Sequence, residues 1–125
     1  MSSDLIAALD NGLLRAGEDI TLRRSVGVTN KANVDVDIRA AVRSPNAQEL
    51  LAGIPQDNFF CIFSPTEINN AQWPGGHLPT TSDVRIPSKA LGDQAFIRGK
   101  WRNVEVAQGF YPGDELCRIE MRVLG

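Results

Sequence analysis

Apolar and polar residues alternate along three stretches of the chain, which is the pattern of β-strands with one buried face. The first stretch begins at Ile20, and the second runs from Val34 to Val42. The third is the most regular and runs from Cys117 to Val123, with charged residues on its other face. Residues 29–33, Thr-Asn-Lys-Ala-Asn, predict a hairpin connection between the first two strands. The alternation therefore predicts a mainly β protein.

Residues 1–17 have a helical period instead. Ser2 or Ser3 can cap the start of this helix, and Gly17 is a natural stop. Gly12 lies inside the helix and costs about 1 kcal/mol relative to alanine, so the helix depends on docking. It docks either on the chain's own barrel or on a neighbouring subunit. Its apolar stripe consists of Leu5, Ile6, Leu9 and Leu13.

The stretch from Ser44 to Asn58 interrupts the alternation with two prolines and a glycine, yet it holds three large aliphatic residues. We expect a long, mobile loop between two early strands, and loops of this length in compact domains are usually functional. The alternative is a short surface helix over residues 47–52 that merely covers the core.

An almost continuous apolar run, Phe-Phe-Cys-Ile-Phe at 59–63, predicts a strand that is buried on both faces or passes through a subunit contact. Ser64, Pro65 and Glu67 then form a capping box, which predicts a short helix to about Gln72. Further along, residues 96–101 predict a tight hairpin, whose second arm continues through Val104 and Val106.

The composition limits the classes of function. The 125 residues are enough for one domain, and 42% hydrophobic with 22% charged residues is typical of a globular fold. The formal charge is −2, and the two signs are interspersed, so tight electrostatic binding of nucleic acid is not expected. No apolar run is long enough to span a bilayer, and the first residues lack the basic region of a secretion signal. Cys61 and Cys117 are expected to be buried free thiols.

Residues that could carry chemistry have simpler explanations. His77 is the single histidine and lies in a stretch rich in glycine and proline, so we expect a loop side chain. Asp35 and Asp37 share one strand face but lack a third acidic ligand, so a solvated face is expected instead of a cation site. Ser64 is expected to cap a helix with its hydroxyl, not to act as a nucleophile. We therefore expect no enzyme activity, cofactor or metal.

The order of signals through residues 20–125 resembles a known family. A buried strand is followed by Ser-Pro-Thr-Glu-Ile at 64–68, Ala-Gln-Trp-Pro-Gly at 71–75, hairpins, Gly-Asp-Glu-Leu-Cys-Arg-Ile-Glu at 113–120, and Val-Leu-Gly at 123–125. This order is similar to that of the small head completion, or stopper, proteins of long-tailed bacteriophages and related gene transfer agents. The stretch 78–92 departs from the family pattern, because it is longer than a compact strand-turn pairing.

The resemblance implies a mainly β fold: a small β-barrel with an N-terminal helix, a short capped helix near residues 65–72 and a long loop between early strands. Residues 1–125 would form a single head-tail joining domain, with a helical segment at 1–17 and the barrel at 18–125. Members of the family are not enzymes. They form a ring beneath the portal and adaptor, close the DNA-filled head and present a surface for tail docking.

The resemblance also implies partners and a location. The partners would be copies of this chain in a six- or twelve-fold ring, portal or adaptor proteins above, and a tail terminator or tail tube below. Packaged double-stranded DNA would pass through the channel without sequence-specific binding. The expected location is the virion neck, after assembly in the bacterial cytoplasm, with no membrane involved.

By position, the long loop falls on residues that could act as plug, gate or tail contact. These channel candidates are Pro45, Gln48, Glu49, Leu50, Leu51, Gly53, Ile54 and Gln56. The candidates for contacts with other subunits are Leu5, Leu9 and Leu13 on the helix, and Arg118, Glu120 and Arg122 on the last strand.

Two other classes of function are weighed against the virion role. One is a small barrel that binds single-stranded nucleic acid, although the sequence has no basic stripe and Trp73 and Trp101 are expected to be core or interface anchors. The other is a hydrolase that uses Asp35 or His77.

Overall fold

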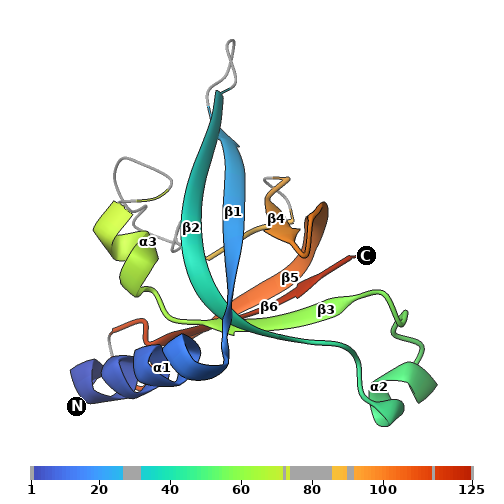
Figure 1. Cartoon of the computed structure of the whole chain (residues 1–125), viewed down its shortest axis with the longest axis horizontal. Helices are drawn as coiled ribbons and strands as arrows, with labels where there is room; N and C mark the ends of the chain where they lie inside the picture. Colours follow the sequence, from blue (N-terminus) through green and yellow to red (C-terminus); the bar gives the residue numbers. More distant parts are fainter. Residues whose placement is uncertain are drawn as a thin grey trace.

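The computed structural model describes residues 2–26, 32–71, 73, 86–89, 92–113 and 115–124. Within these residues, six antiparallel strands close into a barrel in the order β1-β2-β3-β6-β5-β4 (Figure 1). The elements are α1 (Ser2–Ala16), β1 (Glu18–Val26), β2 (Ala32–Arg43), α2 (Ala47–Leu51), β3 (Phe59–Phe63), α3 (Thr66–Ala71), β4 (Gln94–Ile97), β5 (Lys100–Phe110) and β6 (Arg118–Val123). The prediction of a mainly β-barrel with an N-terminal helix is confirmed.

The barrel interior is filled by the alternating apolar residues of the strands. On β1 and β2, Ile20 and Leu22 face inward together with Val36, Ile38 and Ala40, as the period of two predicts. The two strands pair along their whole length, from Glu18 opposite Ala40 to Val26 opposite Ala32. Ala32 and Asn33, which we assigned to the hairpin connection, therefore belong to β2. The last strand is also confirmed, with Ile119, Met121 and Val123 buried in the core.

Helix α1 docks on the chain's own barrel (Figure 1). Leu13 is 4% exposed inside the core cluster, and Leu9 packs against that cluster. The helix ends at Ala16, and the N–H of the next residue, Gly17, donates to the carbonyl of Leu13 at 2.8 Å. The Arg39 side chain of β2 also donates to this carbonyl, at 3.0 Å, and so fastens the helix end to the sheet.

Helix α3 covers the part of β2 that β3 leaves unpaired. β3 pairs with β2 only from Ala40 to Arg43, so the preceding N–H and C=O groups on that side of β2 need other partners. The Glu67 carboxylate accepts from the Arg39 N–H at 2.6 Å, and the Trp73 indole donates to the Val34 carbonyl at 2.8 Å. Ile68, fully buried, joins this cover to the core.

The capping box expected at Ser64 takes a different form. The Ser64 hydroxyl donates to the Asp10 carboxylate of α1 and accepts only a long bond from the Thr66 N–H, at 3.4 Å. Thr66 donates its own hydroxyl to Asp10 at 2.7 Å. We expected backbone amides to be the partners of the Ser64 hydroxyl. This expectation is wrong, because the main partner is the Asp10 carboxylate of α1. The expected helix to about residue 72 is present as α3.

The β4–β5 hairpin is present and turns at Arg98 and Gly99, with φ of 52° and 81°. Positive φ at both turn positions is the signature of a type I′ turn, whose twist matches that of the strands. Beyond the turn, a β-bulge lies between Val104 and Val106. It turns the two valines to opposite faces, since Val104 is 2% exposed and Val106 is 54% exposed.

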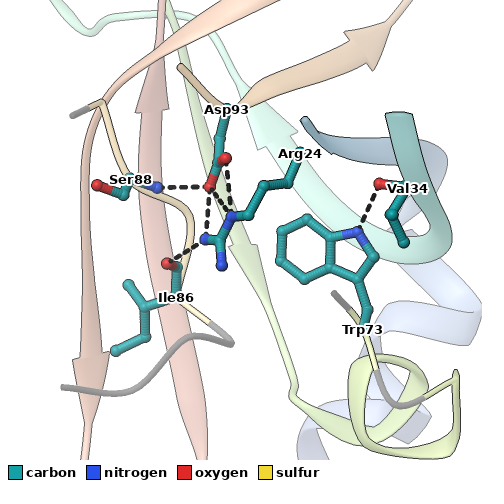
Figure 2. A network of polar contacts seen from close by, with 6 residues as sticks. All are labelled: Arg24, Val34, Trp73, Ile86, Ser88 and Asp93. Carbon is teal, nitrogen blue, oxygen red and sulfur yellow. Dashed lines mark hydrogen bonds and ion pairs between the residues drawn. The ribbon is translucent and has the colours of Figure 1, made fainter. Parts of the chain in front are cut away.

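A polar network lies inside the barrel, at residues that the sequence pattern did not single out (Figure 2). Arg24 and Asp93 are 4% and 1% exposed, and Arg24 donates to both carboxylate oxygens of Asp93 at 2.6–3.1 Å. Arg24 also donates to the Ile86 carbonyl at 3.2 Å, and the Ser88 N–H donates to Asp93 at 2.8 Å. The guanidinium carbon lies 4.8 Å from the centre of the Trp73 ring. The network therefore fixes the segment before β4 to β1.

Several expectations fall outside the described residues. They concern residues 29–31 of the hairpin connection, His77, and most of the stretch 78–92.

Candidate assembly surface

The outer faces of β2, β3, β6 and β5 form an open hollow of about 310 Å³, which we call the outer groove. Its lining residues are Arg43, Phe60, Cys61, Ile62, Val106, Ala107, Gln108, Glu120, Met121 and Arg122. Cys61 and Met121 are buried, whereas their neighbours along β3 and β6 are half-buried and face outward. The outer groove is therefore a surface of the barrel and not part of its core.

Strand register arranges the outward residues in rows. Arg43 lies opposite Phe60, Phe60 opposite Arg122, and Arg122 opposite Val106. The guanidinium of Arg43 stacks on Phe60, with its carbon 4.3 Å from the ring centre. The outer groove thus has an apolar floor between two cationic side chains.

The next row combines Ile62, Glu120 and Gln108, which pair across β3, β6 and β5. Phe60 and Ile62 are half-buried on this face, so the expectation that the apolar run 59–63 is buried on both faces is wrong for a single chain. The alternative expectation, a strand passing through a subunit contact, stays a prediction.

The three charged interface candidates share this outer face of β6. Arg118, Glu120 and Arg122 are each half-buried, and Arg118 is 4.0 Å from Glu120. Among the described residues, the Nε atoms of Arg118 and Arg122 are buried and have no hydrogen-bond partner. Buried polar atoms of this kind are rare, because each loses its water without gaining a bond.

The segment between β2 and β3 contains a helix and lies apart from the barrel (Figure 1). Helix α2 is capped reciprocally: the Glu49 N–H donates to the Asn46 side chain at 2.9 Å, and the Asn46 N–H donates to Glu49 at 2.8 Å. No residue of α2 is buried. The long segment expected between two early strands is present, and its residues 47–51 are helical because Asn46 and Glu49 supply a capping box. The alternative expectation, a short surface helix over residues 47–52, is correct that a helix forms there and wrong that this helix covers the core.

The channel candidates occupy this segment and are mostly exposed. Leu51 is 89% exposed and Leu50 is 41% exposed. Gly53 turns the chain with a φ of 95°, which a residue with a side chain rarely adopts. The remaining candidates divide by exposure. Two are exposed, Gln48 and Gln56, and three are half-buried, Pro45, Glu49 and Ile54.

An ion pair connects α2 to the end of β2. Arg43 donates to Glu49 at 2.7 Å and 3.1 Å, from its two terminal nitrogens. These hydrogen bonds lower the pKa of Glu49 and raise the pKa of Arg43, so both groups are charged at neutral pH. The pair places α2 next to the edge of the outer groove, because Arg43 both lines the groove and binds Glu49 of α2.

The helical interface candidates differ in exposure. Leu13 lies in the chain's own core, so its expected role in a subunit contact is wrong for this fold. Leu9 is partly covered by the same core, and Leu5 is 50% exposed. Leu14, which the stripe did not include, is 71% exposed.

A second group of aromatic and basic side chains lies on the outer face of β1, β4 and β5. The Arg23 guanidinium carbon is 3.9 Å from the Trp101 ring centre, and Phe96 contacts Trp101 with ring centres 5.1 Å apart. Sequence reasoning found no such platform, because Arg23 is far along the chain from Phe96 and Trp101 and meets them only through strand pairing. Arg23 also makes two hydrogen bonds of 2.8 Å to Asp35, which offset its charge.

The residues considered for chemistry are engaged elsewhere in the described part of the chain. Hydrogen bonds from Arg23 lower the pKa of Asp35, and Asp37 accepts from Thr21 at 2.8 Å. Burial raises the pKa of the Cys61 thiol to about 12. Cys61 and Cys117 are both buried thiols that form no disulfide, as expected. Within the described ranges, no group of three His, Cys, Asp or Glu side chains could hold a metal ion.

No protein-family model and no curated protein matches this chain. Among the helices of the described segments, none is long and apolar enough to cross a membrane.

Proposed function

We propose that this chain is a structural virion protein that forms a ring between the portal or adaptor and the tail. The ring would close the DNA-filled head and provide the surface on which the tail docks, with no catalytic step. This location is the neck of a phage or gene transfer agent particle, reached after assembly in the bacterial cytoplasm.

The observation that supports this function best is the outer face of β6 and its neighbours. Apolar side chains lie there between half-buried arginines, and two guanidinium Nε atoms lack hydrogen bonds among the described residues. Such a face suits another protein surface that supplies apolar contact and opposite charge. A ring of identical subunits supplies one at every interface.

The charge of the chain is compatible with a channel for DNA. A formal charge of −2 gives little net attraction for phosphates, so passing duplex would not be held. The segment 44–57 carries α2, which lies apart from the barrel in Figure 1, and it is proposed to line the channel or contact the tail.

Charge reversal on β6 tests the ring. The variant Arg118→Glu with Glu120→Lys and Arg122→Glu is expected to abolish ring formation and to leave filled heads without tails. A matched control reverses three exposed charges elsewhere, with Asp4→Lys, Arg15→Glu and Lys100→Glu, so that the net charge changes equally. Size-exclusion chromatography with light scattering and negative-stain imaging read the result. An unchanged ring in the β6 variant, with circular dichroism showing that it folds, refutes the proposed surface.

One observation favours a second candidate, a barrel that binds single-stranded nucleic acid. Phe96, Trp101 and Arg23 together could stack a base. Asp35 offsets the charge of Arg23, and oligonucleotide-binding barrels have five strands, whereas six close this barrel within the described residues. Salt-dependent binding of an oligonucleotide that Trp101→Ala abolishes would favour this candidate over the virion role.

A further inference from the structure

Arginines that stack on aromatic rings follow a common pattern in this chain. Within the described residues, six guanidinium carbons lie 3.9–4.9 Å from the centre of a ring. Five of these arginines also lie 2.6–4.0 Å from a carboxylate of the same chain. The five pairs are Arg23 with Asp35, Arg24 with Asp93, Arg43 with Glu49, Arg98 with Glu18, and Arg118 with Glu120. Arg102 is the exception: it stacks on Phe59 at 4.5 Å, and no carboxylate of the described residues pairs with it.

Arg102 lies at one end of the barrel. It is opposite Ala95 of the core in β4, and Phe59 is opposite the buried Val123 in β6. Directly opposed residues point to the same side of a sheet, so Arg102 and Phe59 both point to its inner side. Phe59 is the first residue of β3, and Ile97, whose carbonyl accepts from the Arg102 Nε at 3.3 Å, is the last residue of β4. Arg102 is therefore at the barrel end and not on the outer face of β6.

The positive charge of Arg102 has no counterpart at this end among the described residues. Arg98 stacks on the same ring, and its Nε and one terminal nitrogen donate to Glu18 at 3.2 Å and 3.1 Å. Glu18 thus offsets the charge of Arg98 only. The two terminal nitrogens of Arg102 make no hydrogen bond within the described ranges. Neither is buried, because a buried side-chain nitrogen without a partner occurs there only at Arg118 and Arg122.

We propose that Arg102 binds a carboxylate of a different protein that docks on this end of the barrel. The inference rests on the proposed function only for the identity of this neighbour, a protein above or below the ring. A second copy of the chain is disfavoured, because the ring contacts are proposed on the outer face of β6.

The chemistry of the site favours a carboxylate over a phosphate group. The chain completes each of its other five stacked arginines with a carboxylate, and its formal charge of −2 gives little attraction for nucleic acid. A guanidinium can donate to both oxygens of a carboxylate at once. Because stacking on Phe59 already holds this guanidinium in place, less side-chain entropy is lost when the carboxylate binds.

Carbodiimide cross-linking in assembled particles tests the contact directly. Arg102→Lys introduces an amine, which a carbodiimide joins to a carboxylate in contact with it, whereas arginine does not react. We expect a link from position 102 to an Asp or Glu of another virion protein, mapped by mass spectrometry. The matched control is Arg15→Lys, which places an amine on the exposed part of α1. The control is expected to give about tenfold less of such a link, because ion pairs at exposed positions are weak and short-lived.

The outcomes separate this inference from the proposed function. A link from position 102 only to a second copy of the chain overturns the choice of partner. A yield no higher than that of the control overturns the docking. Either result leaves a ring that light scattering and negative-stain imaging still detect. Particles that lack the chain altogether refute the proposed function, and the inference then depends on a binding measurement with the purified chain.

That measurement uses a fluorescein-labelled hexaglutamate peptide and anisotropy at low salt. Arg102→Gln is expected to weaken binding roughly tenfold, because the charge-assisted hydrogen bonds are lost. Arg15→Gln changes the net charge equally and should leave the affinity nearly unchanged, and circular dichroism checks that both variants fold. No binding of the peptide, or equal weakening by the two variants, overturns the inference. Arg102→Gln that weakens binding of a short DNA duplex and not of hexaglutamate overturns the choice of a carboxylate.

Discussion

Arg24 of β1 and Asp93, which precedes β4, form an ion pair inside the barrel, with 2.6 Å between the closest nitrogen and oxygen. Removing one partner leaves the other charge buried and unpaired, which costs about 3–5 kcal/mol in comparable sites. We therefore expect Asp93→Ala to lower the free energy of unfolding by that amount. Urea denaturation followed by circular dichroism measures it.

The double variant Arg24→Met with Asp93→Leu provides the control for this prediction. Apolar side chains of similar size remove both charges together, so most of the loss is expected to be recovered. The Ser88 N–H loses its acceptor in both variants, which keeps the recovery partial. A double variant no more stable than Asp93→Ala would contradict the prediction that the loss comes from the unpaired Arg24 charge.

Alanine at Gly12, inside α1, and alanine at Gly17, just after α1, should change the stability of the chain in opposite directions. Nothing lies within 4 Å of the position that a Cβ would take at Gly12, so Gly12→Ala adds helix propensity and should stabilise the chain by roughly 0.5–1 kcal/mol. At Gly17 a Cβ would lie 2.6 Å from the Leu13 carbonyl oxygen and 3.0 Å from that of Ala40. Gly17→Ala is therefore expected to destabilise. Thermal unfolding of both variants tests the pair, and equal shifts would contradict it.

Glu67 should give the chain a specific pH dependence. Burial raises the pKa of its carboxyl group, against the opposing hydrogen bond from the Arg39 N–H, while the nearby Asp10 adds to the rise. A raised pKa in the folded state means that the folded chain takes up this proton first. The contribution of Glu67 to stability therefore increases as the pH falls from 7 through the folded pKa toward its ordinary value of 4.5.

The variant Glu67→Gln isolates this effect, since glutamine can still accept from the Arg39 N–H but does not titrate. As the pH falls from 7 to 5, the natural chain is expected to become more stable relative to the variant. Urea denaturation at several pH values measures the difference. A difference that does not change with pH would mean that Glu67 is not the responsible group.

Alternation along the strands was sufficient to predict a mainly β protein, whereas its closure into a barrel was expected from the family resemblance. Ile38 and Ile119 are inside because each is one of a series of apolar residues two positions apart. The same rule failed at Val106, because the bulge adds a residue and shifts the strand by one position. The alternation of inward and outward residues that continues from Val104 does not reveal where a strand inserts an extra residue.

The candidate site was predicted only in part, for related reasons. Arg118, Glu120 and Arg122 could be placed on one outer face from the sequence alone, because they lie on a single strand. Phe60 and Val106 join that face through pairing between β3, β6 and β5, which depends on contacts far apart in the chain. The Arg24–Asp93 pair was missed because an arginine in the alternation reads as solvent-facing unless its buried partner is known.

The two cysteines provide the last prediction. Cys61 and Cys117 are 1% and 3% exposed, and burial raises the pKa of Cys61 to about 12. Reaction with thiol reagents requires both access and the thiolate, and the thiolate of Cys61 is scarce at pH 8. We therefore expect the native chain to react negligibly with Ellman's reagent at pH 8 and to release two equivalents of thiol in 6 M guanidinium chloride. Asp93→Ala should react faster than the natural chain in native buffer, because a less stable barrel opens more often. Rapid reaction of one thiol in the natural chain would show that the strand carrying it is not held in the closed barrel.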